Sequence, residues 1–149
     1  MFFWDKHKTI TTCYELISSK VCDEYGLTQM QYDILMFLYN NPQHNTAADI
    51  VKIRKSTKSH VSTSLKGLED RELIKRLQSV ENKKHIEIVL LEKAMPIIED
   101  GIKAQKDFAS YVLSGLTNEE KRICMSVFDK ICRNADEYLK NHAEMENEK

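Results

Sequence analysis

The chain of 149 residues is poor in the residues that interrupt helices, with only four glycines and two prolines. Their scarcity over long segments predicts a mainly helical protein. Apolar runs are also short, and none approaches the roughly 20 residues that span a membrane, so no membrane partner is expected. The apolar start, Met1-Phe2-Phe3-Trp4, stops at Asp5-Lys6 and is too short for a signal peptide.

Cysteine pairs and catalytic motifs are missing as well. The four cysteines contain no Cys-x-x-Cys pair, and none of the five histidines stands at a metal-ligand spacing from a cysteine or acid. The sequence has no nucleophile elbow and no glycine-rich phosphate loop. We therefore expect reduced thiols in the cytoplasm, no metal, no cofactor and no catalytic residue, and hence a protein that is not an enzyme.

The formal net charge of −1 conceals a strong asymmetry along the chain. Between Lys52 and His85, ten Lys and Arg residues stand against four acids, so this segment carries +6 and the remainder carries −7. A positive segment on a negative protein is typical of a nucleic-acid-binding face. A solvated charged surface can carry the same residues, so their spacing must decide between the two interpretations.

Helical spacing of apolar residues covers both ends of the chain. The first helix is expected from about Asp5 to Tyr25, and capping sequences at Thr28 and Thr46 begin the next two. After Glu92 the helical spacing returns, and a final helix from Thr117 to about Lys140 is expected to bury Ile123, Val127, Ile131 and Tyr138. A polar, frayed tail is expected at 141–149. The apolar faces of the terminal helices favour a two-fold dimer.

The centre of the chain predicts a different arrangement. A fourth helix, from Thr57 to Leu73, places its apolar residues on one side and hydroxyl and basic residues on the other. Two strands, Leu73–Arg76 and Ile86–Leu90, then flank a basic turn at Asn82–His85. A short helix, a tight turn, a polar-faced helix and a hairpin are typical of a winged helix-turn-helix, whose second helix enters a DNA groove.

The residues from Leu27 to Leu91 resemble the winged helix-turn-helix of the multiple-antibiotic-resistance regulator (MarR) family. The matching pieces are Leu27-Thr28-x-x-Gln31-Tyr32-x-Ile34-Leu35, Ala48-Asp49-Ile50-Val51, Ser59-His60-Val61-Ser62, Leu68-Glu69-x-x-x-Leu73-Ile74-x-Arg76, and Lys83-Lys84 with Ile88-x-Leu90. The resemblance implies a mainly α fold with a small β-hairpin wing. It places the winged helix-turn-helix at 27–91, an N-terminal dimerisation helix at 1–26 and C-terminal dimerisation helices at 92–140.

The same resemblance implies a homodimeric bacterial transcription regulator, expected to be a repressor, that binds a pseudo-palindromic site in double-stranded DNA. The expected DNA-binding residues are Thr57, Lys58, Ser59, His60, Ser62, Thr63 and Lys66 on the recognition helix, and Arg76, Lys83 and Lys84 on the wing. A small aromatic effector is expected where the dimer helices meet the DNA-binding lobe. The expected ligand-binding residues there are Tyr14, Tyr32 and Tyr39.

Two departures from the family pattern leave alternatives open. Glu72 stands where the family usually has glycine at a helix end, which predicts either a strained cap or a re-routed one. Asn82-Lys83-Lys84 replaces an Asp followed by two Arg, which removes a charge that would orient the wing. A winged-helix protein–protein interaction module with weak or no DNA binding is therefore the alternative function. A redox-sensing thiol at Cys13 or Cys22 is the alternative to a structural cysteine.

Overall fold

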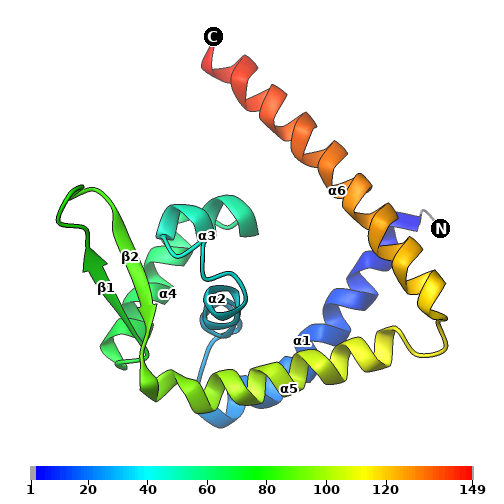
Figure 1. The fold of residues 1–149 in the computed structure, drawn as a ribbon, viewed down its shortest axis with the longest axis horizontal. Helices are drawn as coiled ribbons and strands as arrows, with labels where there is room; N and C mark the ends of the chain where they lie inside the picture. Colours follow the sequence, from blue (N-terminus) through cyan, green and yellow to red (C-terminus); the bar gives the residue numbers. More distant parts are fainter. Residues whose placement is uncertain (1–2, 149) are drawn as a thin grey trace. The chain divides into compact units, whose positions relative to one another are not determined.

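The computed structural model describes residues 3–148, and it divides the chain into two compact units, Met1–Ser110 and Tyr111–Lys149 (Figure 1). Met1, Phe2 and Lys149 lie outside the described residues. The elements of the first unit are η1 (Phe3–Lys6), α1 (His7–Tyr25), α2 (Gln29–Asn40), α3 (Ala47–Arg54), α4 (Lys58–Asp70), β1 (Ile74–Gln78), β2 (Ile86–Leu90), η2 (Glu92–Ala94) and most of α5 (Met95–Val112). The second unit holds α6 (Asn118–Asn147). The predicted fold class, mainly α with a two-stranded hairpin, is confirmed.

Threonine side chains cap the starts of four helices. Each hydroxyl oxygen accepts the backbone N–H of the residue three positions later. The four caps are Thr28, Thr46, Thr57 and Thr117. The backbone N–H groups of Thr28 and Thr117 in turn donate to the side chains of Gln31 and Glu120, which completes a capping box at each helix start. The predicted starts of these four helices are confirmed. They could be predicted because each cap bond joins residues only three positions apart in the sequence.

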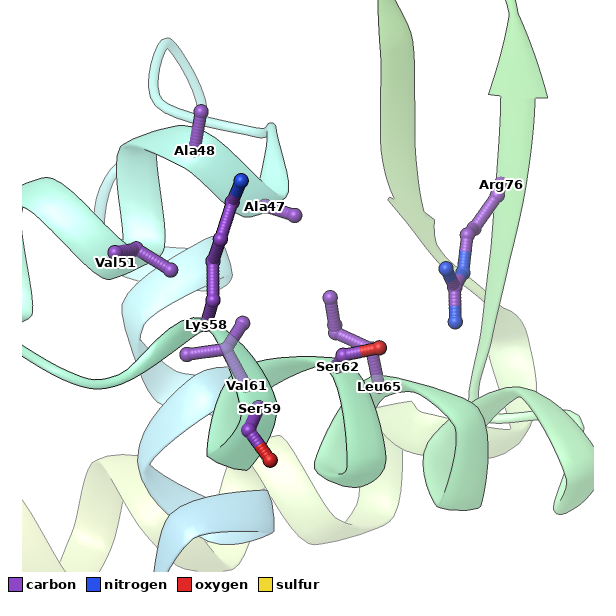
Figure 2. A pocket seen from close by; sticks show the side chains of 9 residues that line it. All are labelled: Ala47, Ala48, Val51, Lys58, Ser59, Val61, Ser62, Leu65 and Arg76. Atoms are coloured by element: carbon purple, nitrogen blue, oxygen red, sulfur yellow. The ribbon is translucent and has the colours of Figure 1, made fainter.

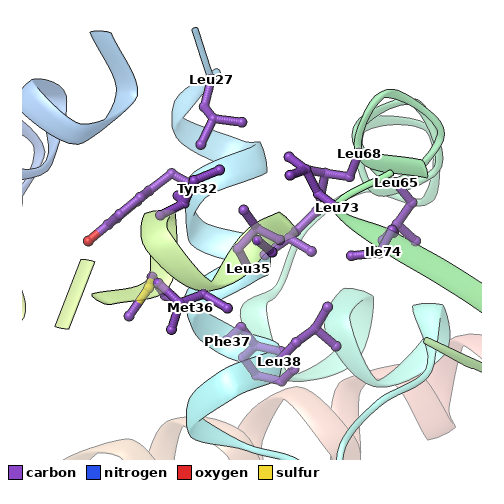
Figure 3. Close-up of a cluster of buried hydrophobic side chains, with 14 of the residues drawn as sticks. Leu27, Tyr32, Leu35, Met36, Phe37, Leu38, Leu65, Leu68, Leu73 and Ile74 are labelled. Atoms are coloured by element: carbon purple, nitrogen blue, oxygen red, sulfur yellow. The ribbon is translucent and has the colours of Figure 1, made fainter. Parts of the chain in front are cut away.

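The α2 helix is the centre of the first unit, and residues on nearly all of its sides are buried. Its side chains Tyr32, Ile34 and Leu35 have no exposed surface, and they share one core with residues of α4 and β1 (Figure 3). The α5 helix approaches α2 so closely that a Cβ at Gly101 would collide with the Met36 sulfur. The α3 and α4 helices and the hairpin are thus built onto the same core as α5.

The end of α4 differs from the predicted end. The helix stops at Asp70 rather than Leu73, and Glu72 adopts a left-handed backbone with φ 59°. The Glu72 N–H donates to the Glu69 carbonyl and the Leu73 N–H donates to the Leu68 carbonyl, which are the two bonds of a Schellman cap. This cap reverses the chain, so β1 begins at Ile74 and extends past the predicted Arg76 to Gln78. Of the two predicted outcomes at Glu72, a strained or a re-routed cap, the structure shows the left-handed, strained one.

Replacing Glu72 with glycine should stabilise the protein by about 0.5–1 kcal/mol, because glycine adopts the left-handed backbone without a Cβ clash. Urea unfolding at a fixed protein concentration measures the change. Glu72→Ala is the matched control, since it keeps the Cβ but removes the carboxylate that lies 3.6 Å from the Lys93 Nζ. Equal gains in the two variants would show that the charge, and not the backbone, is responsible.

Two backbone hydrogen bonds hold the base of the hairpin, one to the loop before α3 and one between the residues that flank the two strands. Its strands pair antiparallel, with Arg76 opposite Ile88. The Ile88 N–H donates to the Asn45 carbonyl at 2.7 Å, and the Leu91 N–H donates to the Leu73 carbonyl at 2.9 Å. We call β1, β2 and the turn at 79–85 the wing. Its base is held by backbone hydrogen bonds both to the loop before α3 and across its own ends.

The α6 helix continues beyond its predicted end at Lys140 to Asn147, so most of the segment expected to be a frayed tail is helical. Residues 141–147 contain no glycine or proline to stop it. The predicted burial of its apolar face does not occur within the single chain, where no described residue of α6 is buried. Ile131 is 41% exposed and Tyr138 is 72% exposed. None of the helices in residues 3–148 is long and apolar enough to cross a membrane.

Candidate nucleic-acid interface

The α4 helix presents one polar face and one apolar face. Ser59, Ser62, Thr63 and Lys66 follow one another at i, i+3, i+4 and i+7, which places them together on the exposed side. The opposite side carries Val61, Leu65 and Leu68, each at most 1% exposed. Burial of this apolar side fixes the rotation of the helix, so its short hydroxyl side chains and Lys66 face outward.

A hollow of about 580 Å³ lies at the margin where the polar and apolar faces of α4 meet, bounded by α3, α4 and β1 (Figure 2). Its residues are Ala47, Ala48, Val51, Lys58, Ser59, Val61, Ser62, Leu65 and Arg76. Lys58 extends toward α3, and Arg76 projects from β1 on the other side of the hollow (Figure 2). Two cations and two hydroxyl groups therefore surround an apolar floor, which suits phosphate oxygens together with apolar base edges. The role of the three α3 residues was missed from the sequence, because their small side chains carry no polar signal.

Arg76 forms an ion pair with Glu69 of α4. Its Nε lies 3.4 Å from the Glu69 Oε2, and both side chains are partly exposed, at 33% and 42%. The pair links β1 to α4, so Glu69 limits the directions in which the guanidinium can point. The sequence pattern does not mark Glu69 as a partner of Arg76, since the contact depends on the chain reversal at Glu72.

The remaining predicted wing residues lie at the tip. Lys83 and Lys84 are exposed, and neither forms an ion pair within residues 3–148. On α4, Lys66 lies 3.6 Å from Asp70, an exposed pair that contributes little to stability. The two wing lysines are thus available to an external anion.

Thr57 and His60 occupy different positions from the other predicted residues. The Thr57 Oγ1 accepts the His60 backbone N–H at 3.2 Å, so Thr57 serves as the helix cap. The His60 side chain is exposed, and its position one residue after Ser59 places it at the margin of the polar face. The structure therefore brings together Lys58, Ser59, Ser62 and Arg76 around one hollow, with the wing lysines at a separate location.

A polar network holds α3 in position beside this hollow. The Arg54 Nη2 lies 2.9 Å from the Asp33 Oδ2 and donates a hydrogen bond to it, which joins α3 to α2. The Gln29 side chain donates to Asp33 and also to the Ser18 hydroxyl of α1. Burial raises the pKa of Asp33, while Gln29 and Arg54 oppose that shift. The Asp33 carboxylate thereby connects α2 to α3 through Arg54, and Gln29 extends the network to α1.

The three tyrosines predicted to bind an effector do not share one environment. Tyr14 is half-buried on α1 and meets the Phe108 ring of α5 edge-on, with ring centroids 5.3 Å apart. Tyr32 has no exposed surface, and its hydroxyl has no hydrogen-bond partner within residues 3–148. Tyr39 is 41% exposed. Burial raises the pKa of both Tyr14 and Tyr32. None of the three lines the hollow between α3, α4 and β1.

Within residues 3–148, the cysteines and histidines form no metal-binding cluster, and Cys22 lacks the environment of a reactive thiol. Cys22 is buried, and burial raises the pKa of its thiol, which is the opposite of what a reactive thiolate requires. Cys13 is partly buried on the same helix. Within residues 3–148, no group of three His, Cys, Asp or Glu side chains could hold a metal ion.

Comparison with known proteins agrees with this geometry. The profile of the MarR family matches residues 25–85. A putative MarR family transcriptional regulator from Listeria monocytogenes, solved with a 26mer DNA, has a TM-score of 0.84 at 24% identity, with 93% of each chain covered. MepR from S. aureus in its DNA-binding conformation has a TM-score of 0.81 at 20% identity, with 91% of this chain and 99% of that chain covered.

At these identities the solved structures establish the fold, whereas the family profile adds a match of the sequence itself. No curated protein matches the chain. The profile covers α2, α3, α4 and most of the wing, which are the elements that build the hollow and its polar helix. Residues 25–85 thus match the profile of the MarR family of transcription regulators, and the fold of the chain resembles that of solved members of this family.

Proposed function

We propose that the protein is a sequence-specific DNA-binding transcription regulator that acts as a homodimer in the cytoplasm and represses its target genes. The observation that carries the proposal is the exposed polar face of α4 beside a hollow with Lys58 and Arg76 at its sides. This face lies in the segment of charge +6, from Lys52 to His85. The DNA complexes of the Listeria monocytogenes regulator and of S. aureus MepR support the same use of the fold.

In the proposed complex, α4 enters the major groove and the wing lies beside it along the backbone. Ser59, Ser62 and Thr63 are short enough to let the helix backbone approach base edges, and Lys66 adds charge. A dimer would place its two copies of α4 in successive major grooves, with half-site centres about one helical turn apart. The operator is therefore expected to be a pseudo-palindrome.

Dimer formation is supported by the exposed apolar side chains of α6. Ile123, Val127, Phe128 and Ile131 are all at least 41% exposed in the single chain. A contiguous apolar face of this kind on a helix is typical of a protein–protein interface. A second copy of the chain fits it best, because oligomers of soluble proteins are most often two-fold symmetric.

We further propose that a small aromatic effector regulates DNA binding. The buried Tyr32 hydroxyl, which interacts with Tyr14, is a polar group among apolar side chains near α1, α2 and α5 and supports a polar ligand there. Tyr14 lies on the neighbouring helix, whereas the exposed Tyr39 has less support. An effector would relieve repression by binding better to the protein conformation that does not fit DNA.

The experiment that tests the function begins by selecting bound fragments from the source genome and sequencing them. On the selected site, Ser62→Ala and His60→Ala should each cost about 1–3 kcal/mol of binding free energy and relax specificity there. Ser110→Ala, an exposed serine of α5 outside the positive segment, is the control and should bind normally. If the protein selects no fragments and elutes from heparin at low salt, the interaction-module alternative replaces the proposal.

A further inference from the structure

The tip of the wing is organised around one side chain, Asn82. Its backbone N–H donates to the Ser79 Oγ at 3.3 Å, and its side-chain Oδ1 accepts the Lys84 N–H at 3.1 Å. Its carbonyl accepts the His85 N–H at 2.9 Å, which closes a four-residue turn. Asn82 therefore takes part in three hydrogen bonds within a loop whose residues are otherwise exposed.

Two further bonds connect this turn to the strands. The Ser79 N–H donates to the His85 carbonyl at 2.9 Å, and the Gln78 side chain donates to the Lys83 carbonyl. With these bonds, the turn has a defined backbone although its side chains contribute no core. Lys83 and Lys84 are the two central residues of the turn, and their ammonium groups form no ion pair within residues 3–148.

The bond from Asn82 to Lys84 is an Asx turn, in which a side-chain oxygen replaces a backbone acceptor. An aspartate could accept the same bond, but it would add a negative charge beside two cations. From Ser79 to His85 the turn carries Lys83 and Lys84 against Glu81, so its formal charge is +1. An aspartate at position 82 would bring that charge to zero and would lower the attraction of the turn for phosphate.

We propose that Asn82 is a positioning residue for DNA binding, which holds the turn so that Lys83 and Lys84 face the DNA backbone together. The proposal rests on the proposed function, because it assigns the two lysines to phosphate contacts. It also explains why the absence of an aspartate does not leave the wing disordered. An uncharged oxygen forms the turn, so the turn keeps its formal charge of +1.

The positioning role is tested first in the free protein, without DNA. In Asn82→Ala, the Lys84 amide should exchange with water at least several-fold faster than in the wild type, as measured by NMR, because its acceptor is lost. Asn82→Asp should retain the slow exchange, since its carboxylate accepts the same bond. Val80→Ala is the control, because Val80 is 97% exposed in the same loop. Unchanged exchange in Asn82→Ala would overturn the proposal whatever the DNA-binding result.

The link to DNA is tested by a double-mutant cycle with Lys83→Ala and Lys84→Ala. Asn82→Ala alone should weaken binding about threefold to tenfold, which corresponds to the loss of one hydrogen bond. In the variant that lacks both lysines, the same substitution should have almost no further effect. An equal loss in both backgrounds would overturn the proposal, because Asn82 would then act independently of the lysines.

Failure of the positioning role of Asn82 can be distinguished from failure of the proposed DNA-binding function. If removal of both lysines leaves binding unchanged while Ser62→Ala weakens it, the function stands and the positioning role of Asn82 toward DNA is overturned. If neither substitution matters, the proposed function itself fails, and the amide-exchange result then describes only the turn. Protection of the Lys84 amide that depends on Asn82, together with the non-additive cycle, supports the proposal.

Discussion

Ile131→Glu should convert the protein to a monomer and lower its affinity for the operator by about 10²- to 10⁴-fold. The size follows from avidity, since a dimer binds its second half-site in an effectively intramolecular step that a monomer lacks. Ile131 is 41% exposed in the single chain and lies one turn beyond Val127, which is 48% exposed. A carboxylate in an interface formed by this face would be buried without a partner, which carries a large energetic cost.

Light scattering and operator titration measure the two effects on the same sample. Ser126→Glu is the matched control, because it adds the same charge to α6 about 140° around the helix from Ile131. We expect the control to remain dimeric and to bind normally. A dimeric Ile131→Glu variant would show that this face is not the interface. A monomer that binds with full affinity would contradict the two-half-site mechanism.

The substitution of both wing lysines, Lys83→Ala with Lys84→Ala, should weaken binding by roughly tenfold per lysine at low salt. The loss should be similar for every DNA sequence, because phosphate contacts carry no direct base readout. The plot of log affinity against log salt should become less steep by about 2, corresponding to two fewer phosphate contacts. Titrations at several salt concentrations, on operator and on unrelated DNA, measure both quantities.

Lys20→Ala with Lys106→Ala is the matched control for this experiment. Both lysines are exposed, they lie on α1 and α5, and both are outside the positive segment. Their removal changes the net charge by the same amount, so it corrects for long-range attraction. If the wing variant binds as tightly as the wild type at every salt concentration, the wing does not contact DNA.

Much of the fold was predictable because its determinants are close in sequence. The caps at Thr28, Thr46, Thr57 and Thr117 each use a bond to the residue three positions later. The left-handed backbone at Glu72 was likewise expected from a departure at a single position. The exact helix ends were less predictable, because α4 stops at Asp70 in a cap formed by a non-glycine residue in the left-handed backbone conformation, which residue type alone does not indicate.

The sequence by itself determined the helical class, the polar face of α4 and the positive charge of the segment from Lys52 to His85, since these follow from local periodicity and residue type. The tertiary structure decided how these parts meet. It placed Ala47 and Ala48 opposite Arg76 around a hollow, and it paired Arg76 with Glu69.

The wing tip shows most clearly the difference between what the sequence determines and what the tertiary structure decides. From the sequence, the asparagine at position 82 indicated only the loss of an orienting charge. In the structure, Asn82 organises the turn through an uncharged oxygen. The physical reason is that a charge can be counted from residue types, whereas a hydrogen bond also needs a backbone path that brings donor and acceptor within about 3 Å.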